Sequence, residues 1–216
     1  EARRSLSAID LASGHSMFPR IRKFHRLIGI TLMLPLAGWV ITGFVFFIKP
    51  GYAGAYEFLT PKTYPLQTSV SISPMPGWRE FRCFRTILGD HLIARTENGW
   101  LHLNPQTMLP REKPSNEELR RLLMDAFSAN AERYGQISRI SADSAWTDTG
   151  VEVTLDWNRV SLLQRGKDTD RIDMLYKIHY LQWTGVGIID KVLGFLGLLL
   201  VATLTVLGAR LAIKGN

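Results

Sequence analysis

The residues of this chain best suited to binding haem or a metal are its five histidines. Two of them, His25 and His179, lie just before long apolar stretches. An imidazole is the usual protein ligand of b-type haem, and a low-spin haem takes two axial ligands. His25 and His179 are therefore candidate haem ligands. The alternative is that each ring lies among lipid headgroups, beside Trp183 or Arg26.

The remaining reactive residues predict no second site. His91 and His102 share one face of a predicted hairpin, but the expected pairing places Arg95 opposite His102. No cysteine or carboxylate is placed to complete a metal-binding set there. The single cysteine, Cys83, rules out an intrachain disulfide. Because no catalytic triad, phosphate-binding glycine loop or paired carboxylates stand out, the sequence predicts no catalytic residue and favours a non-enzymatic protein.

Two apolar segments must position these histidines. Residues 27–48 (LIGITLMLPLAGWVITGFVFFI) form 22 consecutive uncharged positions, which as a helix would be about 33 Å long, enough to cross a bilayer. A buried helix of a soluble protein is the alternative, but such helices are rarely apolar on every face for six turns. A second uncharged run begins at Val192, and we expect a second transmembrane helix over residues 192–211.

The charge distribution predicts how these helices are oriented. The chain carries a net charge of +7, and most of the excess lies in residues 1–26 and at the C-terminal end. By the positive-inside rule, both termini are expected in the cytoplasm and the central domain outside, in the periplasm of a bacterial inner membrane. The central domain itself is nearly neutral, which argues against nucleic acid as a partner.

These observations divide the chain into seven parts. They are a cytoplasmic tail (1–26), a transmembrane helix (27–48), a linker (49–77), a periplasmic domain (78–177), an interfacial segment (178–191), a second transmembrane helix (192–211) and a cytoplasmic C-terminus (212–216).

Within the periplasmic domain, a hairpin is expected around Asn98-Gly99, a strong two-residue turn signal. One face of this hairpin carries Leu92, Ala94, Leu101 and Leu103, and we expect that face in the core. The opposite face, with His91, Ile93 and His102, is then expected outside or against a partner. Arg82, Arg85 and Arg95 are candidates for a basic strip, but an ordinary solvated sheet face is the favoured interpretation.

An amphipathic helix and further strands complete the domain. Ser115 and Glu118 have the spacing of a capping box, and apolar residues follow at helical intervals from Leu119. Alternation over residues 151–157 predicts a half-buried strand. The fold class is therefore an α+β extramembrane domain anchored by two transmembrane α-helices. The expected core comprises Leu101, Leu103, Leu123, Phe127, Val153 and Leu155.

Three stretches resemble the PepSY-associated transmembrane protein family. FHRLIGITLMLPLAGWVITGFVFF, with its late Thr42-Gly43 pair, is similar to the family's first helix. IHYLQWTGVGIIDKVLGFLGLLLVATLTVLGARLAIK is similar to a later element with a histidine before a span, and GWLHLNPQTM fits a PepSY domain. The resemblance implies a bacterial inner-membrane protein, often linked to iron uptake, whose larger relatives include haem-containing siderophore reductases. In those relatives, histidines at the positions of His25 and His179 are the candidate haem ligands.

This chain differs from the larger relatives in having two predicted spans and no nucleotide or flavin motif. His25 and His179 are expected on opposite sides of the bilayer, about 30 Å apart. One haem cannot bridge them, so haem b would have to be shared between subunits.

Small residues on both spans suggest close helix packing, within the pair or with another protein. They are Gly38, Gly43, Gly194, Gly197 and Gly208. We therefore expect a short, two-span PepSY-type module that is an accessory or assembly subunit of an inner-membrane complex and binds no cofactor itself. Its partners would be the bilayer and other membrane subunits, with a homo-oligomer left open. The alternative is a haem-containing electron-transfer protein linked to ferric-siderophore reduction or iron uptake.

Overall fold

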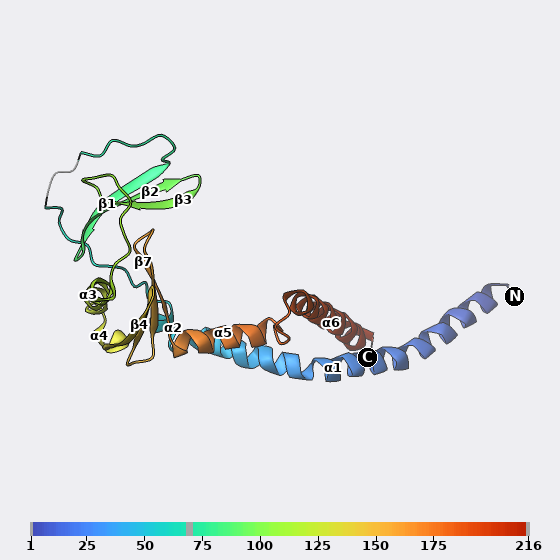
Figure 1. Ribbon diagram of the computed structural model, residues 1–216. Helices are drawn as coiled ribbons and strands as arrows, with labels where there is room; N and C mark the ends of the chain where they lie inside the picture. Colours follow the sequence, from blue (N-terminus) through green and yellow to red (C-terminus); the bar gives the residue numbers. More distant parts are fainter. Residues whose placement is uncertain (1, 68–70, 215–216) are drawn as a thin grey trace. The chain divides into compact units, whose positions relative to one another are not determined.

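The computed structural model describes residues 2–67 and 71–214, with side chains described from Pro19 to Ile213 (Figure 1). The chain forms two compact units: one contains residues 1–50 and 172–216, and the other contains residues 51–171. Its helices are α1 (Ala2–Ile48), α2 (Tyr52–Ala55), α3 (Asn116–Phe127), α4 (Ala131–Tyr134), α5 (Lys167–His179) and α6 (Gly187–Lys214). Its strands are β1 (Glu80–Thr86), β2 (Gly89–Thr96), β3 (Gly99–Leu103), β4 (Ile137–Ser141), β5 (Ser144–Thr147), β6 (Glu152–Asp156) and β7 (Ser161–Arg165).

The first unit is built on α1 and α6, which pack against each other. Both contain a stretch long and apolar enough to cross a membrane, Pro19–Ile48 and Gly187–Ile213, and few residues of either stretch are buried in the protein. The expectation of two apolar terminal helices is confirmed. Two boundaries differ from the prediction: α1 continues back to Ala2 through the expected tail, and α6 begins at Gly187, before Val192.

The second unit contains two antiparallel sheets with the strand orders β1-β2-β3 and β4-β5-β6-β7. Within each sheet, every strand therefore pairs only with strands next to it in sequence. The predicted α+β class is confirmed, and β5 is a strand that the pattern did not predict. Helix α5 begins at Lys167. Asp168 and Asp170 occupy its first turn, where acidic side chains interact favourably with the helix dipole.

Helix α3 forms as its sequence predicts. The Ser115 side chain accepts a hydrogen bond from the backbone N–H of Glu118, and the Glu118 carboxylate accepts one from the Ser115 backbone N–H. These bonds satisfy backbone donors that the helix itself leaves free. The buried face of α3 joins residues of β2, β4 and β6 in one core, which includes the predicted Leu123, Phe127, Val153 and Leu155.

The hairpin of β2 and β3 corrects three expectations. Arg95 pairs with Trp100 and Ile93 lies opposite His102, because Glu97 and Asn98 form the turn rather than Asn98 and Gly99. The face expected outside or against a partner is buried within the chain: Ile93 joins the main core cluster and His91 is fully buried, while Leu92 and Ala94 of the other face are buried as expected. Leu101, predicted in the core, is instead 44% exposed, and Leu103 is buried outside the main core cluster.

Part of the predicted linker belongs to the second unit. Ala55 and Leu59 are buried, and Tyr64 forms an isolated antiparallel bridge with Arg85. The Gln164 side chain on β7 donates hydrogen bonds to the backbone oxygens of residues 54, 55 and 57.

A side-chain clamp joins the beginning of this unit to its end. Arg133 on α4 forms an ion pair with Asp168 on α5, with 2.7 Å between Nη1 and Oδ2. The same guanidinium donates to Gln164 Oε1 at 2.6 Å, and its Nε lies 3.9 Å from the Glu57 carboxylate. Residues from the start and the end of the unit are thus held around one arginine.

Candidate functional site

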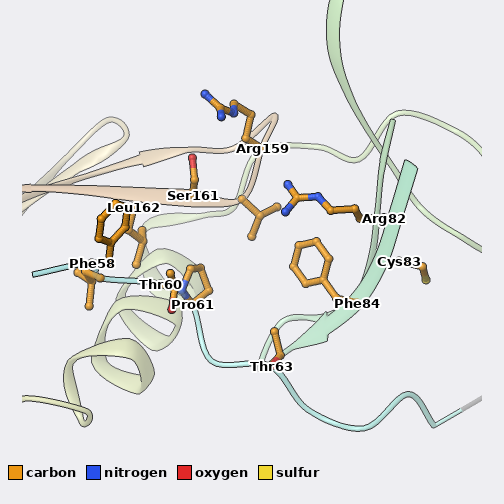
Figure 2. Close-up of a pocket in the computed structure, with 12 residues that line it drawn as sticks. Phe58, Thr60, Pro61, Thr63, Arg82, Cys83, Phe84, Arg159, Ser161 and Leu162 are labelled. Atoms are coloured by element: carbon orange, nitrogen blue, oxygen red, sulfur yellow. The ribbon is translucent and has the colours of Figure 1, made fainter. Parts of the chain in front are cut away.

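A groove of about 700 Å³ lies in the second unit, between the edge strands β1 and β7. Residues 58–63 form its third side (Figure 2). Its walls are mainly apolar, with Phe84 from β1, Phe58 and Pro61 from the crossing segment and Leu162 from β7. Phe58 is 95% exposed. The groove therefore has the size and lining of a ligand-binding site.

Arginines lie along one side of the groove. Figure 2 shows the Arg82 side chain reaching from β1 into the groove, with Arg159 above it. The guanidinium carbons of Arg82, Arg95 and Arg159 lie 5.8, 5.8 and 5.4 Å from the centre of the Trp100 ring. All three arginines are exposed, and none forms an ion pair within the described part of the chain.

This arrangement revises the predicted basic strip. Arg85 forms an ion pair with Asp90, with 3.0 Å between Nη1 and Oδ1, so its charge is compensated and it is not part of the arginine cluster. Arg159, which the sequence analysis did not select, takes its place from the turn between β6 and β7. A single exposed cation–π contact contributes about 0.5–1 kcal/mol, which does not remove the mutual repulsion of three cations. The cluster is therefore an anion-attracting site at the edge of the groove.

Val160, in the same turn, has a φ of +48° and is 5% exposed. A β-branched residue rarely adopts this left-handed conformation. It persists here because the Val160 side chain is held in the main core cluster. Local strain of this kind costs about 1–3 kcal/mol and often accompanies binding sites. The turn that carries Arg159 is thus fixed in place by the core.

A buried imidazole pair lies under the hairpin. His91 Nδ1 is 2.9 Å from His102 Nε2, and His91 Nε2 is 2.7 Å from Thr86 Oγ1. The Trp157 ring packs on His102 with 4.3 Å between ring centres. Burial, with the nearby Arg111 guanidinium, lowers the pKa of His91 to about 3 and that of His102 to about 4. The pair is neutral near pH 7.

The described residues contain no group of three or more potential metal ligands. His91 and His102, placed on the outer face by the sequence analysis, form a core contact instead. Cys83 is half-buried, and burial together with the Asp90 charge raises the pKa of its thiol. A thiol of raised pKa is a weak nucleophile, so Cys83 is poorly suited to covalent chemistry.

In the first unit, His179 lies against α1. Thr42 Oγ1 is 2.6 Å from the Gly38 carbonyl oxygen and 2.8 Å from His179 Nδ1. The hydroxyl has one proton, and the shorter contact assigns it to the carbonyl. Nδ1 is then the donor to Thr42, which leaves the lone pair on Nε2. The indole N–H of Trp39 also donates to the His179 carbonyl oxygen at 2.6 Å.

This geometry is compatible with haem ligation on one side. A ligating histidine ordinarily donates its other ring nitrogen to a nearby acceptor, as Nδ1 does here. His179, Trp39 and Leu198 line an apolar cavity of about 410 Å³. Among the described residues that line it, His179 is the only histidine. A second axial ligand would have to come from another chain or another element.

His25 lies far from this cavity along α1. A Cβ added to Gly208 would lie 3.3 Å from His25 Nε2, which places this imidazole against the C-terminal part of α6. Thr42, the partner of His179, is 17 positions further along α1, about 25 Å at the rise of an α-helix. The structure does not bring the two candidate ligands together.

The predicted helix-packing glycines differ in their surroundings. A Cβ on Gly38 would meet Ile178, one on Gly194 would meet the Tyr180 backbone, and one on Gly197 would lie 2.8 Å from Leu181. These contacts, like that of Gly208, are made within the chain. Gly43 has no described atom within 4 Å of its Cβ position and so remains open to another helix.

Sequence reasoning did not find the groove, because its walls come from three segments far apart in the chain. Two features of the sequence could have pointed to the groove. They are the arginines at positions 82, 85 and 95 and the aromatic residue Phe58 in the expected linker. Comparison with family models, curated proteins and solved structures found no match to this chain.

Proposed function

We propose that this chain is a short member of the PepSY-associated transmembrane type and acts as a membrane-anchored accessory or assembly subunit. The central unit would lie in the periplasm of a bacterial inner membrane, with both termini in the cytoplasm. The proposal draws on the resemblance of the sequence and on the charge asymmetry, both of which point in this direction.

The observation that carries the proposal is the apolar surface left on α1 and α6 after they pack together. Val40 is 73% exposed and Phe44 is 65% exposed on α1, and Phe195 is 72% exposed on α6. Lipid covers such a surface, and so do the helices of a membrane partner. Because Gly43 is the open small residue on α1, we expect a partner helix to approach there.

Affinity purification in mild detergent, followed by mass spectrometry of co-purifying chains, tests the proposal. We expect a discrete membrane protein to be retained by the natural chain and released by Gly43→Leu. Gly187→Leu is the matched control, since Gly187 is also a helical glycine with an open Cβ position. Retention of no chain beyond those held by an unrelated two-helix membrane protein would contradict the proposal.

A second candidate function, haem-dependent electron transfer, is favoured by the hydrogen bond between His179 and Thr42. A reduced-minus-oxidised absorbance spectrum of the purified chain tests it. If haem is bound, His179→Ala should remove it from the cavity beside Trp39, and His25→Ala should not. Loss of all haem in either single variant of a two-haem protein would refute separate sites.

A further inference from the structure

We propose that the groove between β1 and β7 binds an extended acidic peptide segment of a partner protein. The peptide backbone pairs with the free edge of β1, and a peptide carboxylate lies beside Arg82 and Arg159. This inference rests on the proposed function, because it states the chemistry of the segment by which the accessory subunit would hold its partner.

The edge of β1 offers unpaired backbone groups. Tyr64 N–H donates to the Arg85 carbonyl oxygen at 2.9 Å, so the backbone groups of Arg85 point away from β2. Because alternate residues of a strand face the same edge, the N–H and C=O of Cys83 and Phe81 point the same way. Neither residue bonds to a backbone group beyond β2 within the described part of the chain. An extended peptide can therefore add to β1 beyond Tyr64.

The side chains beside this edge are arranged for such a segment. Figure 2 shows the Cys83 side chain turned away from the groove, whereas Arg82 and Phe84 extend into it. Cys83 thus offers its backbone groups for pairing, and the side chains of Arg82 and Phe84 contact the peptide. Phe84 and Leu162 provide apolar walls on the two sides. A peptide strand alternates its side chains between faces, so every second residue would enter the groove.

The positive charge of the groove favours an acidic peptide. Arg82 and Arg159 line the groove and, together with Arg95, surround Trp100 with positive charges that have no carboxylate partner within the described residues. A carboxylate placed there gains charge-assisted hydrogen bonds from the guanidinium groups and relieves their mutual repulsion. A neutral or basic peptide gains neither. The strained but buried Val160 holds the Arg159 turn in position before binding, which lowers the ordering cost.

The experiment uses the full chain in nanodiscs of phosphatidylcholine and a displayed library of random hexapeptides. We expect selection to enrich peptides rich in Asp and Glu. One enriched peptide, labelled with fluorescein, is then titrated by anisotropy. Arg82→Gln combined with Arg159→Gln should weaken its binding by at least tenfold. Arg79→Gln is the control, because Arg79 lies just before β1 but forms an ion pair with Glu97.

A proline test separates backbone pairing from charge attraction. Cys83→Pro removes an N–H that faces the groove side and leaves the β1–β2 ladder intact, since proline is tolerated at strand edges. We expect it to abolish peptide binding, whereas Cys83→Ala should retain it. Circular dichroism verifies that both variants fold. If Cys83→Pro does not fold, the selected peptide N-methylated at alternate backbone amides replaces it: this peptide keeps its charge but cannot pair as a strand, so it should not bind the natural chain.

Three outcomes would overturn the inference. The library could enrich no acidic sequences, or the selected peptide could bind the arginine and proline variants as tightly as the natural chain. Alternatively, the arginines could serve a lipid surface: brominated phosphatidylglycerol would then quench tryptophan fluorescence in the natural chain but not in the arginine variant, with no peptide selected. If a partner still co-purifies in any of these cases, the accessory-subunit proposal stands and only the peptide inference fails.

Discussion

The buried pair His91 and His102 should make the central unit unstable in mild acid. In the folded protein both pKa values lie at or below about 4, whereas a histidine in an unfolded chain titrates near 6.5. Below pH 6.5 the unfolded state therefore binds two protons that the folded state does not. The contribution of the two neutral rings to stability is therefore fully present above that pH, and it is lost as the pH drops toward 4.

The size of the effect follows from these pKa values. Between pH 6 and pH 4 the free energy of unfolding should fall by up to about 2.7 kcal/mol per pH unit, because two protons are taken up on unfolding. At pH 5 each histidine lowers the free energy of unfolding by about 2 kcal/mol relative to pH 8, and the pair lowers it by about 4 kcal/mol. A domain is typically stable by about 5–15 kcal/mol, so the loss is a large share of the total.

Urea unfolding of the full chain in detergent, followed by circular dichroism at pH 8, 6 and 5, measures this loss. The double variant His91→Gln/His102→Gln carries no titrating ring, so its stability should change by about 4 kcal/mol less between pH 8 and pH 5. The control His25→Gln keeps both buried rings and should retain the full dependence. The same pH dependence in the double variant and the natural chain would refute the assignment of these two rings as neutral, buried groups.

Three further predictions concern topology and core. In a cysteine-free background, a cysteine at Asn158 should react with a membrane-impermeant maleimide in spheroplasts and one at Ser7 should not; the opposite result would reverse the orientation. Leu123→Ala should lower the free energy of unfolding by about 2–5 kcal/mol, because this leucine is fully buried, whereas Leu101→Ala should change it far less; urea unfolding that shows equal losses would contradict the observed faces. Ser115→Ala should cost about 1 kcal/mol by removing the helix cap, and thermal unfolding that is unchanged would show that the capping box contributes no stability.

The sequence predicted elements better than it predicted which surfaces meet. Helix α3 was found because its capping box and apolar spacing are local signals. In β2 the alternation correctly separated the two faces but not which one contacts the core, since Leu92 and Ala94 on one side and His91 and Ile93 on the other are all buried. Hydrophobicity favours leucine over histidine, so the prediction buried the face with Leu92 and Ala94, as observed, and wrongly left the face with His91 and Ile93 outside the core.

The groove could not be predicted, for a different reason. Arg82 lies on β1 of one sheet and Arg159 in the β6–β7 turn of the other, and only tertiary packing places both beside Trp100. The hairpin turn was misplaced by one residue: Asn98-Gly99 is a strong local signal, but Thr96 pairs with Gly99 and the turn is Glu97-Asn98. Local patterns carry no information about such distant contacts.

The clamp around Arg133 has a consequence for how α1 and α6 find each other. Within the central unit, the Cβ position of Gly51 lies 4.0 Å from Asp168 Cβ, so the points where the chain enters and leaves the unit are adjacent. Folding of the unit therefore closes the long loop between the two apolar helices. Once the unit has folded, the two helices are tethered segments at high effective concentration, and most of the entropic cost of bringing them together has already been met. The sheets themselves need only local pairing, because each strand pairs with a sequence neighbour, whereas the clamp joins distant parts of the chain.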